Sequence, residues 1–131
     1  MNDSYLTSYD VSDFSNITAL DKVQSNPGSG VIIHNVHLLN DQFAVVAYYK
    51  DGVVLFDVSH PDNMIEVGSY DTDPGESGGD YGGTWGVYPY LPSGNIIASD
   101  IWDAGTSNGK LTIITPTYVA ASWLEGTVTD S

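Results

Sequence analysis

The sequence predicts an all-β protein that is built from repeated units of short antiparallel strands. Residues 5–12 read YLTSYDVS, and 47 positions later residues 52–59 read GVVLFDVS. A third copy begins at residue 109 with GKLTIITP. Between the copies, apolar residues alternate or come in short bursts, without the periodicity of an amphipathic helix. A repeat of about 40–50 residues that consists only of strands is typical of a β-propeller, a ring of four-stranded sheets called blades.

Ten segments have the apolar pattern of strands, and turn-forming residues separate them. In chain order they are 5–11, 17–24, 31–39, 42–49, 52–58, 64–70, 84–90, 95–101, 109–115 and 117–124. The connections at Asn40-Asp41 and Asp51-Gly52 suit tight hairpins, because Asn, Asp and Gly tolerate positive φ angles. The segments group as the last two strands of one blade, a complete blade over 31–70, and a third blade over 84–115.

Two central strands are apolar on both of their faces. In segment 42–49, Phe43 and Val45 lie on one face, while Ala44 and Val46 lie on the other. A sheet with one face in water would instead alternate apolar with polar residues. The pattern therefore predicts that this sheet is covered on both sides, as in a stack of blades.

The repeat also predicts that the chain is part of a larger protein. Ring closure takes about four to eight blades, and this chain holds about two to two and a half. We expect residues 1–116 to form a partial propeller. The tail over 117–131 ends in EGTVTDS, which resembles the first strand of small β-sandwich modules such as the carboxypeptidase regulatory domain. Uncovered blade faces at the ends of the array favour self-association of the isolated chain.

The charge of the chain excludes several classes of partner. Its 131 residues include 17 acidic and 3 basic ones, for a formal charge of −14 at pH 7. Such a charge repels nucleic acids and anionic membranes. No apolar run approaches the ~20 residues that cross a bilayer, and the first residues have no signal-peptide pattern. There is no cysteine, so disulfides and thiolate metal sites are excluded.

Two longer segments resemble a known family. HNVHLLNDQFAVVAYYKDGVVLFDVSHPDNMIEVGSYDT at 34–72 and GGTWGVYPYLPSGNIIASDIWDAG at 82–105 are similar to the LVIVD-repeat β-propellers of bacterial surface proteins, in particular the choice-of-anchor B group. The resemblance covers most of residues 5–115. It implies an exported protein at the cell surface or outside the cell, whose signal peptide would lie upstream. It implies no established reaction and no catalytic residues.

The first strands of the second and third blades carry the candidate ligand-binding residues. Aligning them makes Trp85 equivalent to His34 and Tyr88 equivalent to His37. These aromatic and polar groups predict a small-molecule or glycan site, with blade packing as the alternative. A metal shared by His34 and His37 is disfavoured, because residues three apart on a strand point to opposite faces unless a bulge intervenes. Asp100 on the next strand is a further candidate.

The acidic loop between the second and third blades is a candidate Ca²⁺ site. It carries four carboxylates, and hard cations take six to eight oxygen ligands. These residues are Asp71, Asp73, Glu76 and Asp80. The alternative is a solvated acidic turn. Asp10 and Asp57 instead recur at equivalent repeat positions, which predicts a structural role as acceptors of hydrogen bonds from turn amides.

The leading hypothesis for function is therefore non-enzymatic. We expect an extracellular or cell-surface propeller module that acts as a scaffold or binds glycan or protein ligands. The alternative is a hydrolase-type propeller with a metal or carboxylate site in its channel, for which His34, Trp85 and Asp100 are the residues to test. A third hypothesis is a spacer without a ligand.

Overall fold

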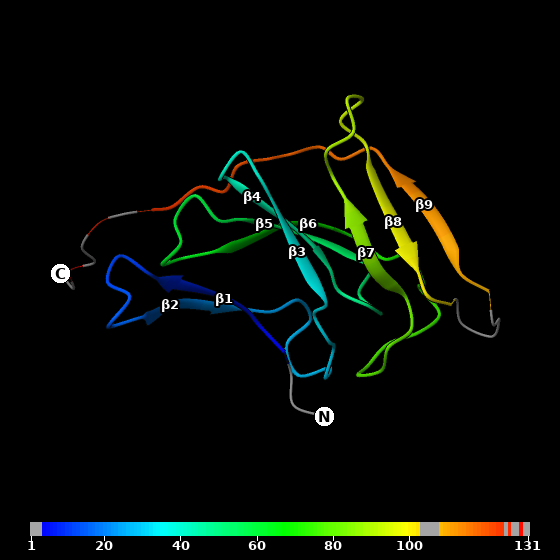
Figure 1. Ribbon diagram of the computed structural model, residues 1–131, viewed down its shortest axis with the longest axis horizontal. Coiled ribbons are helices and arrows are strands. Elements are labelled where there is room, and N and C mark those ends of the chain that lie inside the picture. The colour runs from blue at the N-terminus through cyan, green and yellow to red at the C-terminus, as the bar shows by residue number, and fades with distance from the viewer. Residues whose placement is uncertain (1–3, 103–107, 125, 127–128, 130–131) are drawn as a thin grey trace.

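The computed structural model covers residues 1–131 and describes residues 4–102, 108–124, 126 and 129. The described residues form nine β-strands (Figure 1). They are β1 (Leu6–Asp10), β2 (Thr18–Val23), β3 (Asn35–Leu39), β4 (Phe43–Ala47), β5 (Val53–Asp57), β6 (Ile65–Tyr70), β7 (Thr84–Tyr88), β8 (Ile96–Asp100) and β9 (Lys110–Ile114). This part of the chain contains no helix that is long and apolar enough to cross a membrane.

The strands form three antiparallel sheets in chain order. β1 and β2 make the first sheet, β3 to β6 the four-stranded middle sheet, and β7 to β9 the third sheet. Within each sheet, strands that are neighbours in the sequence pair with each other, and Figure 1 shows the sheets following one another across the molecule. The prediction of an all-β chain is confirmed, and so is the grouping of nine of the ten predicted strands.

The repeat in the sequence is also a repeat in the hydrogen-bonded register. In the first sheet the pairing runs from Leu6↔Val23 to Asp10↔Thr18, with a β-bulge between Ser8 and Tyr9. In the middle sheet, β5 pairs with β6 from Val53↔Tyr70 to Asp57↔Ile65, with a bulge between Leu55 and Phe56. Each of these residues lies 47 positions after its counterpart in the first sheet. β1–β2 is therefore the structural equivalent of β5–β6.

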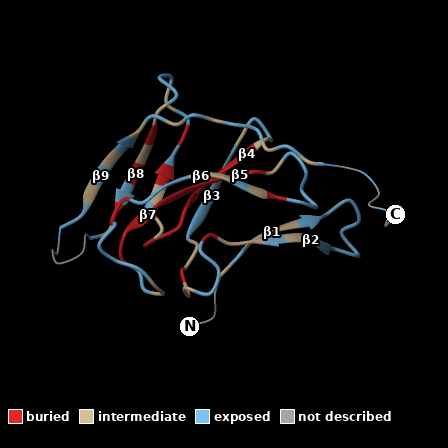
Figure 2. Cartoon of the chain, turned by 180° about the vertical axis from the view of Figure 1, so that it is seen from behind, coloured by how far each residue is buried: buried red, intermediate tan, exposed pale blue. Residues whose placement is uncertain are grey.

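Both faces of the two central strands of the middle sheet, β4 and β5, are buried, as the sequence predicts. Every residue of β4 and β5 is buried, and Figure 2 shows the burial concentrated in the middle sheet and in the parts of the third sheet that face it. One face packs on the first sheet through Ala44, Val46, Val54 and Phe56, with Leu6 and Val23 against them. The opposite face packs on the third sheet through Val45, Ala47, Val53 and Leu55, against Val87, Ile96 and Ala98. The three sheets thus stack face to face.

The recurring aspartates are turn residues, as predicted. The Asp10 carboxylate accepts a hydrogen bond from the Ser12 amide at 2.9 Å, and the Asp57 carboxylate accepts one from the Ser59 amide at 3.0 Å. Burial raises the pKa of Asp57, but hydrogen bonds from the hydroxyl and the amide of Ser59 outweigh burial and leave this pKa below its ordinary value. Each aspartate therefore fixes the turn that follows its strand.

The segment after β9 differs from the prediction. Residues 115–124 contain no strand, although 117–124 was predicted to form one. The chain instead returns across the middle sheet (Figure 1), where the Ala121 amide donates to the second Asp57 oxygen at 2.9 Å. The Trp123 indole donates to the Asn63 carbonyl at 3.0 Å. These side-chain and loop partners take the place of strand pairing. Several residues of the predicted tail module, 125, 127–128 and 130–131, lie outside the described residues.

Candidate functional site

Trp85 lies at an irregularity in the first strand of the third sheet. β7 pairs with β8 through Thr84↔Asp100 and Gly86↔Ser99, so Trp85 is the extra residue of a β-bulge. Bulges re-aim a side chain out of the regular alternation and are frequent beside binding sites. The Trp85 side chain is 50% exposed, whereas Thr84 before it is fully buried. Trp85 is thus directed out of the stacked core.

His34 holds the Trp85 ring in place from the neighbouring sheet. The Trp85 indole Nε1 donates to His34 Nε2 at 2.6 Å. Because Nε2 accepts this bond, the proton of the neutral imidazole is on Nδ1, and Nδ1 donates to the Trp85 carbonyl at 2.5 Å. One residue therefore fixes both the backbone and the side chain of Trp85.

Two tyrosines extend the ring cluster around His34. The His34 ring lies 5.3 Å from the Tyr49 ring, edge to face, and Tyr49 lies 5.5 Å from Tyr81. Tyr49 is buried and Tyr81 is exposed. We call Trp85, His34, Tyr49 and Tyr81 the His34 cluster. Its two exposed tips are the faces of Trp85 and Tyr81.

The backbone of Tyr49 joins the middle sheet to the third sheet. Its amide donates to the Thr84 carbonyl at 3.0 Å, and the Thr84 amide donates back to the Tyr49 carbonyl at 2.9 Å. Tyr49 adopts a φ of 41 degrees, which L-residues rarely take. Non-glycine residues in this region store about 1–3 kcal/mol of strain and are concentrated at functional sites. The bridge therefore holds Tyr49 in a strained conformation, with its ring in edge-to-face contact with the His34 ring.

A second group of rings continues along the same strand. Tyr88 contacts Tyr90 at 5.5 Å between ring centroids, and Tyr90 contacts His37 at 5.6 Å. The Tyr90 hydroxyl also donates to the Leu38 carbonyl at 2.7 Å. Tyr88 and Tyr90 are 49% and 44% exposed. The structure therefore joins Tyr88 to His37 through Tyr90, a residue that the sequence analysis did not single out.

The two histidines do not point apart, in contrast to the prediction from strand alternation. The His34 ring contacts Trp85, and the His37 ring contacts Tyr90, so both rings lie against the β7 segment. β3 begins only at Asn35, so regular alternation does not govern His34.

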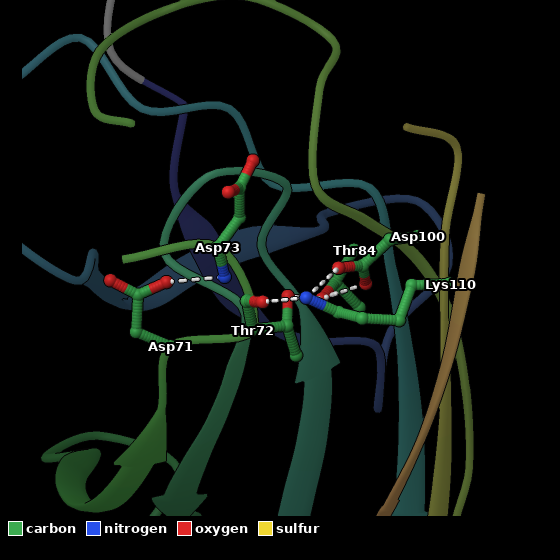
Figure 3. Close-up of polar contacts among 6 residues, drawn as sticks. All are labelled: Asp71, Thr72, Asp73, Thr84, Asp100 and Lys110. Carbon is green, nitrogen blue, oxygen red and sulfur yellow. Dashed lines mark hydrogen bonds and ion pairs between the residues drawn. The ribbon is translucent and has the colours of Figure 1, made fainter. Parts of the chain in front are cut away.

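Asp100 belongs to a separate, buried polar network (Figure 3). The Thr84 hydroxyl donates to Asp100 at 2.9 Å, so it accepts the hydrogen bond from the Thr72 hydroxyl at 2.7 Å. Lys110 Nζ lies 4.0 Å from the second Asp100 oxygen and donates to the Thr72 carbonyl. This network ties the β6–β7 connection to β7, β8 and β9. Asp100 is thus engaged by Thr84 and Lys110 rather than by His34 or Trp85.

The acidic loop already holds a cation, which is a lysine side chain. The nearly buried Lys50 ammonium lies 2.8 Å from Glu76 and 2.8 Å from Asp80. The hydrogen bonds that Lys50 donates to Asp80 and then to Glu76 raise the pKa of Lys50, and the bond that Asp80 accepts lowers the pKa of Asp80. The Asp71 carboxylate accepts the Asp73 amide at 2.8 Å.

Lys50 is the residue that sequence reasoning missed at this loop. It lies in the turn between β4 and β5, and its position in the sequence gives no sign that it will reach residues 76–80. Within the described ranges, no three or more His, Asp or Glu residues are arranged to hold a metal ion. Ca²⁺ binding by Asp71, Asp73, Glu76 and Asp80 stays a prediction.

Comparisons with protein-family models, with curated proteins and with solved structures find no match to this chain. A function is therefore argued from the residues themselves. Two features support it: the exposed aromatic side chains on and beside β7, and the repeated hydrogen-bond register of the sheets.

Proposed function

We propose that this chain is part of an extracellular β-propeller module that binds neutral glycans through Trp85. The observation that carries the proposal is the fixed, half-exposed indole of Trp85, which is set on a bulge and held by both nitrogens of His34. Tyr81, Tyr88 and Tyr90 supply further exposed rings along the same segment.

The propeller architecture is supported by the geometry of the repeat. The pairing of β1 with β2 recurs 47 residues later with the same bulge. The central strands β4 and β5 of the middle sheet are covered on both faces, as blades are within a ring. The outward face of β9 keeps Leu111 and Ile113 exposed at 66% and 56%, and a following blade would cover that face. The isolated chain is therefore expected to self-associate.

The membership in the LVIVD-repeat family and the location outside the cell belong to the same proposal. They are supported by the resemblance over residues 34–72 and 82–105, and the acidic composition is compatible with them. A signal peptide upstream in the parent gene is the expected finding. A parent gene that encodes a cytoplasmic protein would overturn this part of the proposal.

The chemistry of the Trp85 surface favours sugars. The apolar faces of sugar rings stack on flat aromatic side chains, which combine apolar area with little conformational freedom. His34 fixes the Trp85 ring before binding, so little side-chain entropy remains to be lost when a ligand arrives. The formal charge of −14 repels sulfated and sialylated chains, which leaves neutral glycans as the preferred class.

Binding to an array of neutral and acidic oligosaccharides tests the proposal. We expect neutral oligosaccharides to bind, and Trp85→Ala to lower the affinity at least fivefold, or about 1 kcal/mol. Phe14→Ala is the matched control, because Phe14 is an exposed aromatic residue on the β1–β2 connection, remote in sequence from β7. His34→Phe keeps an aromatic ring and removes both hydrogen bonds, so it should weaken binding through the lost orientation of Trp85.

Two outcomes would overturn the glycan proposal. One is an array on which no neutral oligosaccharide binds above background. The other is binding that Trp85→Ala and Phe14→Ala reduce equally, which would locate the contact elsewhere.

A further inference from the structure

The open edge of β1 is the most informative surface outside the ring groups. In the middle sheet, β5 lies between β4 and β6 and pairs with both. β1 is the repeat equivalent of β5, yet among the described strands it pairs only with β2. Its other edge presents backbone groups that, in β5, are bonded to β4. An open strand edge is a template for a further strand.

A cleft lies beside this open edge, between the first and middle sheets. Its volume is about 310 Å³. Apolar side chains from both sheets dominate its lining, among them Leu6, Val36, Leu38, Ala44 and Met64. Val36 and Leu38 on β3 are 43% and 53% exposed. These are large apolar residues on a sheet face that is elsewhere covered.

The interface between the middle and third sheets shows how this cleft would look when it is filled. There, Val87 on β7 pairs with Ala98, as Val36 on β3 pairs with Val46. Val87 is only 6% exposed, because the middle sheet has all four strands and covers it through Val45 and its neighbours. Val36 is seven times more exposed at the equivalent place, where the first sheet has only two strands among the described residues. This difference in exposure indicates that the side chains that would cover Val36 belong beside β1.

We infer that the β1 edge and this cleft receive a β-hairpin of the repeat type, equivalent to β3–β4. The hairpin would pair antiparallel with Leu6–Asp10 in the register that β4 takes on β5, where Phe43 pairs with Asp57 and Ala47 with Val53. Its residues equivalent to Phe43, Val45 and Ala47 would be apolar and would cover Val36 and Leu38. This inference rests on the repeat architecture of the proposed function and is independent of glycan binding.

A graft of the chain's own hairpin supplies the occupant as a defined probe. Residues 31–50 are joined directly to Ser4, the repeat equivalent of Asp51, so that the grafted β4 leads into β1 as the natural β4 leads into β5. Hydrogen exchange then measures how fast the backbone amides of β1 and of β3, which carries Val36, exchange with solvent. We expect both to exchange roughly tenfold more slowly than in the chain without the graft. The matched control carries Glu at the grafted copies of Val45 and Ala47 and should give no protection.

The outcomes separate the possible occupants. Equal exchange with the apolar graft and with its Glu control would overturn the inference. So would a dimer of the ungrafted chain in which β1 is already protected, because a second copy would then be the natural occupant. If the apolar graft protects β1 while no neutral oligosaccharide binds on the array, this inference holds and the glycan proposal fails.

Discussion

Substitution of Gly83 by alanine tests the junction between the middle and third sheets. Gly83 has a φ of 81 degrees, and a Cβ added there would lie 2.4 Å from the Tyr49 carbonyl oxygen. That oxygen accepts the Thr84 amide in the bridge that joins the two sheets. The positive φ costs alanine about 1 kcal/mol, and loss of the two bridge hydrogen bonds adds about 2 kcal/mol. We expect Gly83→Ala to lower the free energy of unfolding by about 3 kcal/mol in total.

Gly94→Ala is the matched control for this prediction. Gly94 has a φ of 79 degrees, but a Cβ added there meets no atom within 4 Å. It should therefore cost only the conformational term, about 1 kcal/mol. Urea unfolding, followed by tryptophan fluorescence at 25 °C, measures both variants. Equal losses for Gly83→Ala and Gly94→Ala would refute the close approach of Gly83 to Tyr49 and with it the bridge.

Three further changes test the core and the charged groups. Val45→Ala and Val46→Ala remove fully buried groups from opposite faces of β4, so each should lower the free energy of unfolding in urea by about 2 kcal/mol. Val36 is half-exposed, so Val36→Ala should lower it clearly less. A near-zero change for either β4 variant would contradict burial of both faces. Glu66 is exposed, but its partial desolvation and then the Asp51 charge raise its pKa, so its ionised form slightly weakens the fold at neutral pH, and Glu66→Gln should stabilise by about 0.5 kcal/mol at pH 7 after solvent screening. This gain should vanish as the pH falls below the unfolded value of about 4.3, and a gain that persists there would contradict the sign. Lys50→Met should lower stability by about 1 kcal/mol, because Glu76 and Asp80 lose their counter-charge. Ca²⁺ at about 5 mM should raise the Tm of this variant more than the Tm of the parent or of Lys22→Met, because Lys50 no longer competes for the two carboxylates; an equal shift in all three proteins would contradict a Ca²⁺ site at this loop.

The sequence predicts the sheets well because their signal is local. Alternation, turn residues and the 47-residue repeat are properties of neighbouring positions, and nine strands and three sheets follow from them. The repeat also explains why Asp10 and Asp57 are structural, since each accepts the amide two residues later. The equivalence of His34 and Trp85 was likewise visible, and the structure brings these two side chains into contact.

What the sequence does not predict depends on contacts between distant segments. Lys50 reaches Glu76 and Asp80 only because the β4–β5 turn lies against the β6–β7 loop. Asp100 is drawn into the core by Thr84 and Lys110, and no local pattern marks it as a partner of either. The segment 115–124 has strand-like composition, yet its partners are the Asp57 carboxylate and the Asn63 carbonyl rather than a neighbouring strand.

The most direct test of the proposed binding surface is a titration that observes the indole groups one by one. The chain has three tryptophans, so its ¹H–¹⁵N spectrum contains three indole signals. Trp85 Nε1 donates to His34, whereas Trp123 Nε1 donates to the Asn63 carbonyl and serves as the internal reference. Addition of a neutral oligosaccharide from the array should shift the Trp85 signal and leave the Trp123 signal in place. A Trp85 signal that does not move at saturating oligosaccharide, or a shift confined to Trp123, would contradict the proposal.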